Sequence, residues 1–205
     1  MSVVADCGRR LLLRITLRDV DPPVWRRVAV AEDLTLAQLH GVIQRAFGWQ
    51  DCHLHEFEIA SDRFGRPDFC GHFPGSAPRV VDERKVALGD ILGARRSFRY
   101  WYDFGDDWWH DVVVEGREAA EQDAPRATLL AGENACPPED CGGPPGYVEL
   151  LSVLRDPEHP EHAEMREWAG AFDPRRFDLA AAKRRVAAVR RTPTVRGGSA
   201  GKTGA

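Results

Sequence analysis

The stretch SFRYWYDFGDDWWHDVVVEG, residues 97–116, contains the hairpin on which the predicted fold of this 205-residue chain is built. Aromatic and β-branched residues stand on both sides of a Gly-Asp-Asp centre, a pattern typical of two antiparallel strands joined by a tight turn. Three turns of two or four residues fit within residues 105–108. Each of them places Asp103 and His110 on one face of the hairpin, so the stretch predicts a cross-strand Asp–His pair.

This pair allows a functional and a structural interpretation. In the functional one, Asp103 orients the imidazole of His110, and the second ring nitrogen stays free to act as a base or a metal ligand. In the structural one, the two groups satisfy each other beneath the tryptophans. The Asp-Phe-Gly triplet within the stretch also matches a protein-kinase motif, but the chain lacks the other kinase motifs, so we treat the match as chance.

Hydrophobic periodicity marks the other elements on both sides of the hairpin. RLLLRITLRDVDPPVWRRVAV, residues 10–30, predicts two strands around an Asp-Pro-Pro turn. T-L-A-Q at Thr35 has the spacing of a capping box, and Gly48 ends the helix that follows. HLHEFEIA, residues 53–60, alternates like a strand. Further elements are predicted as a short strand around Phe64 and as helices at residues 86–93, 147–155, 160–169 and 179–191.

Together these elements predict an α+β fold, a mostly antiparallel sheet of hairpins packed against the Thr35 helix and the C-terminal helices. We expect one domain over residues 8–191, followed by a disordered basic tail at residues 192–205. No apolar run reaches the roughly 18 residues that a membrane span needs. The five cysteines are odd in number and irregularly spaced, which favours free thiols in a reducing compartment. We therefore expect a soluble, cytoplasmic protein without membrane contact.

Charge is unevenly distributed along the chain. The net charge is −4, but every acidic residue lies at or before Asp178, whereas several basic residues follow it. An acidic body argues against a broad duplex-DNA surface and favours a protein or peptide partner. The basic tail is the segment through which nucleic acid could be contacted. The oligomeric state is left open by the sequence.

Metal-binding and catalytic chemistry point to a second group of polar residues. His53 and His55 stand two apart on a predicted strand, so they and His110 are candidate metal ligands. The loop ENACPPEDCGGPPGY contains Glu139 and Asp140, which either lie beside His110 as catalytic carboxylates or cap the helix that follows. A metal-dependent hydrolase or nuclease would use Asp103, His110, Glu139 and Asp140.

A binding surface is the other possibility. Trp25 and Arg26 belong to the cluster in the acidic body that mixes aromatic and basic groups, which suits either a structural pair or a nucleic-acid platform. Asp106, Trp108 and Tyr147 would line a polar cleft between the hairpin tip, the HLHEF strand and the Pro-Pro-Glu-Asp loop. Such a cleft would accept a partner without catalysis.

Five motifs in this order resemble the Ri-plasmid ORF-three-like family: LRDVDPPVWRRVAV, TLAQLHGVIQRAFGW, HLHEF, YDFGDDWWHDV and ENACPPEDCGGPPGY. Some members of that family are labelled TnpR-like passenger proteins of insertion elements. The resemblance implies a single α+β domain and an association with mobile DNA, but no established activity. Because the chain has no arranged recombinase nucleophile, recombination is not carried over. We therefore expect an uncharacterised, mobile-element-associated accessory or binding module without a cofactor, and keep the metal-dependent hydrolase or nuclease as the alternative.

Overall fold

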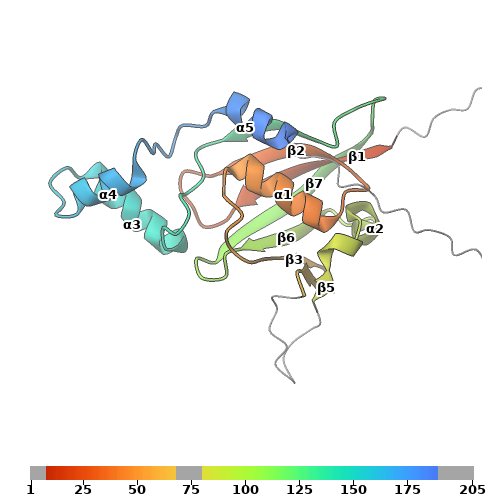
Figure 1. The fold of residues 1–205 in the computed structure, drawn as a ribbon, viewed down its shortest axis with the longest axis horizontal. Helices are drawn as coiled ribbons and strands as arrows, with labels where there is room; N and C mark the ends of the chain where they lie inside the picture. The colour runs from red at the N-terminus through yellow and green to blue at the C-terminus, as the bar shows by residue number, and fades with distance from the viewer. Residues whose placement is uncertain (1–7, 68–79, 189–205) are drawn as a thin grey trace, which may run out of the picture.

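The computed structural model describes residues 8–67 and 80–188 (Figure 1). Its centre is an eight-stranded sheet of order β5-β4-β3-β6-β7-β1-β2-β8, antiparallel except between β4 and β5. The strands are β1 Arg9–Leu17, β2 Trp25–Ala31, β3 His55–Ile59, β4 Asp62–Gly65, β5 Val81–Asp82, β6 Ser97–Tyr102, β7 Trp108–Ala119 and β8 Ala127–Glu133. The predicted α+β class with a mostly antiparallel sheet is confirmed.

The helices cover one part of this sheet and extend beyond it. They are α1 Leu36–Phe47, α2 Leu88–Leu92, α3 Gly143–Arg155, α4 His162–Ala169 and α5 Leu179–Ala187, with a single 3₁₀ turn at Glu83–Lys85. In Figure 1, α1 and α5 lie together over the sheet, while α3 and α4 project from one end as a pair. None of these helices, in the ranges that the structure describes, has the length and apolar character needed to cross a membrane.

The first hairpin and α1 form as the sequence predicts. Alternate residues of β1 are buried, and so are Arg26 and residues 28–30 of β2, the strand that contacts α1. The hydroxyl of Thr35 accepts a hydrogen bond from the backbone N–H of Gln38, whose side chain accepts one from Thr35 in return. Gly48 closes the helix with φ of 97°, a left-handed conformation that costs glycine little.

The β6–β7 hairpin forms, but in a different register from the expected one. Tyr102 pairs with Trp108, so the loop has five residues, Asp103–Asp107, instead of two or four. An odd loop length moves every side chain of one strand to the other face. Asp103 and His110 therefore do not form a cross-strand pair, and that prediction is wrong.

Two physical reasons favour the five-residue loop. Asp103 and Asp107 both adopt positive φ, 53° and 59°, which Asp tolerates better than most residues, and the N–H of Asp107 donates to the carbonyl of Asp103 at 2.7 Å. The observed register also buries the aromatic rings Tyr100, Tyr102 and Trp108 on the core side. Burying large aromatic surface is worth several kcal/mol, so it decides the register.

Other differences are local. The edge strand β8 was not predicted, because ATLLAGE combines weak alternation with three small residues. Helix α3 starts at Gly143 rather than at Tyr147, since Pro144 and Pro145 occupy the first turn, where a backbone N–H has no helical partner. The predicted end of the last helix at Arg191 and the tail at residues 192–205 lie outside the described residues. The predicted domain boundaries stay a prediction.

Candidate metal centre

His53 lies at the point where three loops meet. The loop before β3 carries His53, the β6–β7 loop carries Asp103, and the loop before α3 carries Glu139 and Asp140. From Nε2 of His53, the nearest oxygens are Oδ1 of Asp140 at 3.1 Å, Oδ2 of Asp103 at 3.5 Å and Oε2 of Glu139 at 3.9 Å. We call these four residues the His53 cluster. All four are candidates from the sequence, and the structure places the three carboxylates around Nε2 of His53.

Asp103 is held in place by its own loop. Its Oδ1 accepts hydrogen bonds from the backbone N–H groups of Gly105 at 3.0 Å and Asp106 at 3.3 Å. Its Oδ2 is the oxygen that faces His53. One oxygen is therefore used to fix the carboxylate, and the other is presented to the cluster.

Glu139 repeats this division between its two oxygens. Its Oε1 accepts from the backbone N–H of Gln50 at 2.8 Å and from the hydroxyl of Tyr102 at 3.1 Å. Its Oε2 is buried without a hydrogen-bond partner, and so is Nε2 of His53. Only 9% of the Glu139 side chain is exposed, so an unpartnered oxygen at this place is costly.

The loops that carry the cluster are locked to each other. Oδ2 of Asp106 accepts from the N–H of Gly142 at 3.2 Å. Gly143 has φ of 68°, and a β-carbon there would collide with the carbonyl oxygen of Asp106. Asp140 itself has φ of 57°, one of several strained backbone positions around the cluster. The spacing between Asp103 and Asp140 is therefore fixed by backbone packing.

The donor set suits a divalent metal ion. Bonds of about 2.0–2.2 Å at tetrahedral angles separate neighbouring ligand atoms by roughly 3.4 Å. The distances of 3.1, 3.5 and 3.9 Å from Nε2 of His53 to the three carboxylates lie near this value, and the candidate ligand atoms form two groups that share His53, one with Asp103 and Asp140 and one with Cys52 and Glu139. Carboxylates anchored through one oxygen are the usual form of preorganised metal ligands. Cys52 adds a sulfur on the exposed side, where Cys52, His53 and Glu139 can converge on one point. Burial is the largest cause that raises the pKa of the Cys52 thiol, and the carboxylate of Glu139 adds to it.

A second polar cluster lies next to the first and, among the described residues, none of its buried side-chain nitrogens or oxygens lacks a hydrogen-bond partner. The rings of His40 and His55 stack at 3.4 Å, and Nε2 of His55 pairs with Glu83 at 2.8 Å. His40 Nε2 donates to Asp51 at 2.7 Å, and its Nδ1 accepts from the hydroxyl of Tyr100 at 2.7 Å. Burial lowers the pKa of His40, which keeps the ring neutral and consistent with this pattern. We call these five residues the stacked-histidine network.

Gln44 closes the stacked-histidine network. Its side chain donates to Tyr100 at 3.1 Å and accepts from the backbone N–H of Asp51 at 3.0 Å. The sequence analysis did not single out His40, although its place on the buried face of the predicted helix was a usable signal. His55, a predicted metal candidate, belongs to this network rather than to the His53 cluster.

His110 lies apart from both clusters. It is fully buried, and its ring contacts the rings of Phe47, Trp49 and Tyr100. Burial lowers the pKa of His110 to about 3, so the imidazole is neutral. The structure does not bring it together with Asp103, Glu139 or Asp140.

The predicted binding residues separate into buried and accessible ones. Trp108 and Tyr147 are completely buried, and Arg26 is 1% exposed. Arg26 donates to backbone carbonyls on three segments, Ala46, Trp25 and Glu133–Asn134. It holds the core together and does not meet the surface.

Trp25 and Asp106 keep partial exposure, but both have internal partners. The indole of Trp25 donates to Glu133 at 3.0 Å, and the guanidinium of Arg14 lies over its ring. Asp106 is bonded to Gly142 as described above. Trp25 is therefore a structural contact on the sheet, whereas Asp106 supports the His53 cluster.

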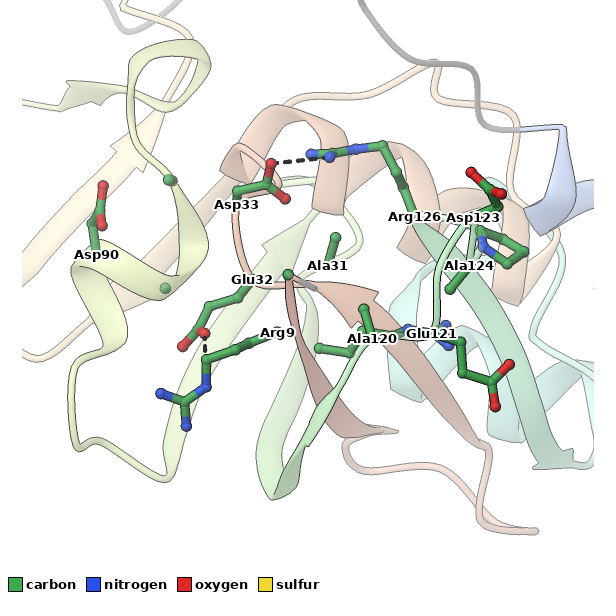
Figure 2. A pocket seen from close by; sticks show the side chains of 15 residues that line it. Arg9, Ala31, Glu32, Asp33, Asp90, Ala120, Glu121, Asp123, Ala124 and Arg126 are labelled. Carbon is green, nitrogen blue, oxygen red and sulfur yellow. Dashed lines mark hydrogen bonds and ion pairs between the residues drawn. The ribbon is translucent and has the colours of Figure 1, made fainter. Parts of the chain in front are cut away.

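A pocket of about 720 Å³ lies at the far end of β1 from the hairpin loop (Figure 2). Acidic and basic side chains alternate on its wall and pair with each other, Arg126 with Asp33 at 3.0 Å and Arg9 with Glu32 at 3.6 Å. Within the described residues, none of its carboxylates has a buried oxygen without a partner. Its three arginines each pair with a carboxylate, although Nε of Arg10 is buried without a hydrogen-bond partner. The His53 cluster has both a histidine nitrogen and a carboxylate oxygen buried without such a partner, which makes it the better candidate site.

The fold and the cluster define an α+β protein with a preorganised carboxylate–histidine centre. The chain matches the plasmid pRiA4b ORF-3-like family over residues 9–181 and belongs to that family. It is 43% identical over 174 residues to an uncharacterized protein, y4hQ, of Sinorhizobium fredii strain NBRC 101917 / NGR234, a match that covers 83% of this chain and 84% of the relative.

A solved structure shows the same fold. The crystal structure of MM3350, a protein of unknown function from Methanosarcina mazei Go1, superposes with a TM-score of 0.75 at 34% identity. The match covers 84% of this chain and 97% of that one. The family resemblance expected from the five sequence motifs is confirmed. Both relatives are uncharacterised, so they assign no activity to the site.

Proposed function

We propose that the protein is a divalent-metal-binding module whose ligands are His53, Asp103, Glu139 and Asp140. One observation carries the proposal: Nε2 of His53 and Oε2 of Glu139 face each other at 3.9 Å, both buried and neither hydrogen-bonded. A metal ion between them would satisfy both atoms at once.

A protonated His53 is the competing explanation for the cluster. It would form one good ion pair, with Asp140 at 3.1 Å, on a carboxylate that is 71% exposed. The more buried oxygens of Asp103 and Glu139 stand at 3.5 and 3.9 Å, at or beyond hydrogen-bonding distance. A proton on His53 leaves Glu139 unsatisfied, whereas a metal ion does not.

The test is isothermal titration calorimetry on protein that has been stripped with a chelator, using Zn²⁺ and Mn²⁺ in turn. We expect saturable metal binding at one site. His53→Ala should weaken the metal affinity at least about 100-fold, because it removes a residue that binds the ion directly. Glu149→Gln, a charge change on the exposed side of α3, is the matched control and should bind like the parent. Equal binding by the parent and His53→Ala would contradict the proposal.

A metal-dependent hydrolase or nuclease is the second candidate, and one observation favours it. A pocket of about 370 Å³ opens beside Cys52 and His53, so an ion there could keep a coordination position for water or substrate. A screen of the metal-loaded protein against phosphoesters and single- and double-stranded nucleic acids tests it. Activity that is lost in Asp103→Asn would support it, and inactivity on every substrate would favour a binding role.

The wider role stays a proposal as well. The family name supports an accessory function connected with mobile DNA, and the acidic body supports a protein or peptide partner more than duplex DNA. The basic residues after Asp178 are the segment that could contact nucleic acid. Affinity purification of the full chain, with and without metal, tests whether a partner depends on the site.

A further inference from the structure

Cys52 lies beside the His53 cluster on its solvent side. One ligand atom each from Cys52, His53 and Glu139 lie within 4.8 Å of one another, close enough for one ion to draw the three together. The thiol is free and exposed, and Cys52 and His53 both line the pocket of about 370 Å³. An ion that arrives through this pocket therefore meets the sulfur and the imidazole on the same wall.

Tyr102 holds these three residues in one place. Its hydroxyl accepts a hydrogen bond from the backbone N–H of Cys52 at 3.3 Å and donates one to Oε1 of Glu139 at 3.1 Å. Its ring packs edge-on against the ring of His53, with the centroids 5.8 Å apart. Because Tyr102 is completely buried, these contacts fix the positions of the three residues relative to the core.

The atoms that face an ion are left uncommitted. Oε2 of Glu139 and Nε2 of His53 are buried and form no hydrogen bond, and the Glu139 side chain is only 9% exposed. Sγ of Cys52 makes a long contact of 3.9 Å with the Tyr102 hydroxyl. The sulfur can therefore turn about one side-chain bond toward an ion without losing a strong hydrogen bond.

The donor set of this group differs from that of the Asp103 and Asp140 group. A thiolate favours soft or borderline ions such as Zn²⁺, whereas carboxylates alone suit hard ions such as Mn²⁺. One thiolate and one carboxylate also neutralise a divalent ion, and three protein ligands of mixed type with an open position are usual around zinc. Both groups contain His53, so the kind of ion decides whether sulfur is used.

We propose that Cys52 is a further ligand of the centre and selects between metals. Its thiolate joins the shell of a thiophilic ion such as Zn²⁺, on the side of His53 and Glu139, and stays out of the shell of Mn²⁺. The thiol releases its proton to solvent when the ion binds. The inference rests on the metal centre proposed above, because His53 and Glu139 belong to both.

The first experiment measures the affinities of Zn²⁺ and Mn²⁺ by calorimetry on the full chain, stripped with a chelator and kept reduced. Cys52→Ser should lower the Zn²⁺ affinity at least about 100-fold, the upper end for a group that only supports a ligand. The Mn²⁺ affinity should stay the same. Cys141→Ser is the matched control and should change neither, since Cys141 lies two residues after Glu139 but belongs to none of the ligand groups among the described residues.

The second experiment loads the same proteins with Co²⁺ and records the near-ultraviolet charge-transfer band that a thiolate ligand produces. We expect the band in the parent and in Cys141→Ser, and its loss in Cys52→Ser with Co²⁺ still bound. Bound Co²⁺ without the band in the parent, a band that persists in Cys52→Ser, or an equal loss of Zn²⁺ and Mn²⁺ affinity would overturn this inference and leave the metal centre standing. A parent that binds none of the three ions would overturn both.

Discussion

Residues 51–55 contribute side chains to two polar clusters. The clusters differ in how many of their buried polar atoms have hydrogen-bond partners. Asp51 and His55 point into the stacked-histidine network, where both ring nitrogens of His40 and Nε2 of His55 have partners at 2.7 or 2.8 Å. His53, between them in sequence, points into a cluster in which its Nε2 lies 3.1 Å from Asp140 without forming a hydrogen bond, and Oε2 of Glu139 has no hydrogen-bond partner. Residues two apart in one short segment thus belong to different clusters.

Hydrogen-bond saturation separates a structural polar cluster from a candidate binding cluster. Both clusters combine histidine and carboxylate, and composition does not separate them. A saturated network stabilises the fold because each buried group keeps its hydrogen bonds. Groups that are held in position through one atom and left unpartnered at the other destabilise the free protein, and a ligand recovers that energy when it binds.

Breaking the saturated network should give the largest effect, on stability. Glu83 is 2% exposed and pairs with His55, so Glu83→Leu leaves a buried imidazole nitrogen without a partner. We expect the free energy of unfolding to fall by about 3 kcal/mol, as for one half of a buried pair. Chemical denaturation measures this. A loss below about 0.5 kcal/mol, the scale of a surface change, would show that the network is not structural.

The corresponding change in the His53 cluster should act on binding instead. Glu139→Gln keeps the shape of the side chain and removes one charge from a group of carboxylates. Metal affinity should fall about 100-fold, equivalent to about 2.7 kcal/mol, while the stability of the metal-free protein stays the same or rises. Calorimetry and denaturation of metal-free protein check the two halves. Strong destabilisation with unchanged affinity would reverse the roles of the two clusters.

The stability of the protein at acidic pH should depend on the buried His110. The pKa of His110 is about 3 in the folded chain, below its ordinary value of 6.5, so the unfolded chain takes up this proton first as the pH falls. The native state therefore loses stability below pH 6.5, by about 2 kcal/mol between pH 7 and pH 5 from this one group. Denaturation at both pH values in the parent and in His110→Phe measures it. If His110→Phe loses as much stability as the parent protein between pH 7 and pH 5, His110 does not cause the loss.

The smallest expected effect concerns support of the site. Tyr102 donates to Oε1 of Glu139 at 3.1 Å, so Tyr102→Phe removes one of the two bonds that aim the carboxylate. Metal affinity should fall about tenfold, or about 1.4 kcal/mol, as for other groups that orient a ligand. Calorimetry at constant pH measures the change. An unaltered affinity would mean that the Gln50 N–H alone positions Glu139.

The sequence predicted the positions of the strands and helices better than which side of each strand faces the core. Periodicity and the Thr35 capping box were sufficient for β1, β2 and α1, because local signals determine them. The β6–β7 register was not predictable in the same way. Its five-residue loop depends on positive φ at Asp103 and Asp107 and on burial of aromatic rings against α1, which are properties of the packed protein.

The candidate site shows the same division. His53, Asp103, Glu139 and Asp140 were recognisable as metal-binding residue types, but their convergence depends on three loops that meet only in the folded chain. His110 was wrongly joined to Asp103 because the register was wrong. The supporting roles of Tyr102 and Gln50 had no sequence signal, since each acts through a single hydrogen bond to one oxygen of Glu139.

The most direct test of the metal centre is a crystal structure of the protein soaked in Mn²⁺ or Zn²⁺, with anomalous scattering used to locate the ion. We expect a peak within about 2.2 Å of Nε2 of His53, coordinated by the free oxygens of Asp103, Glu139 and Asp140. A peak between His40 and His55 instead, or no ion with His53 paired directly to Asp140 at saturating metal, would contradict the account.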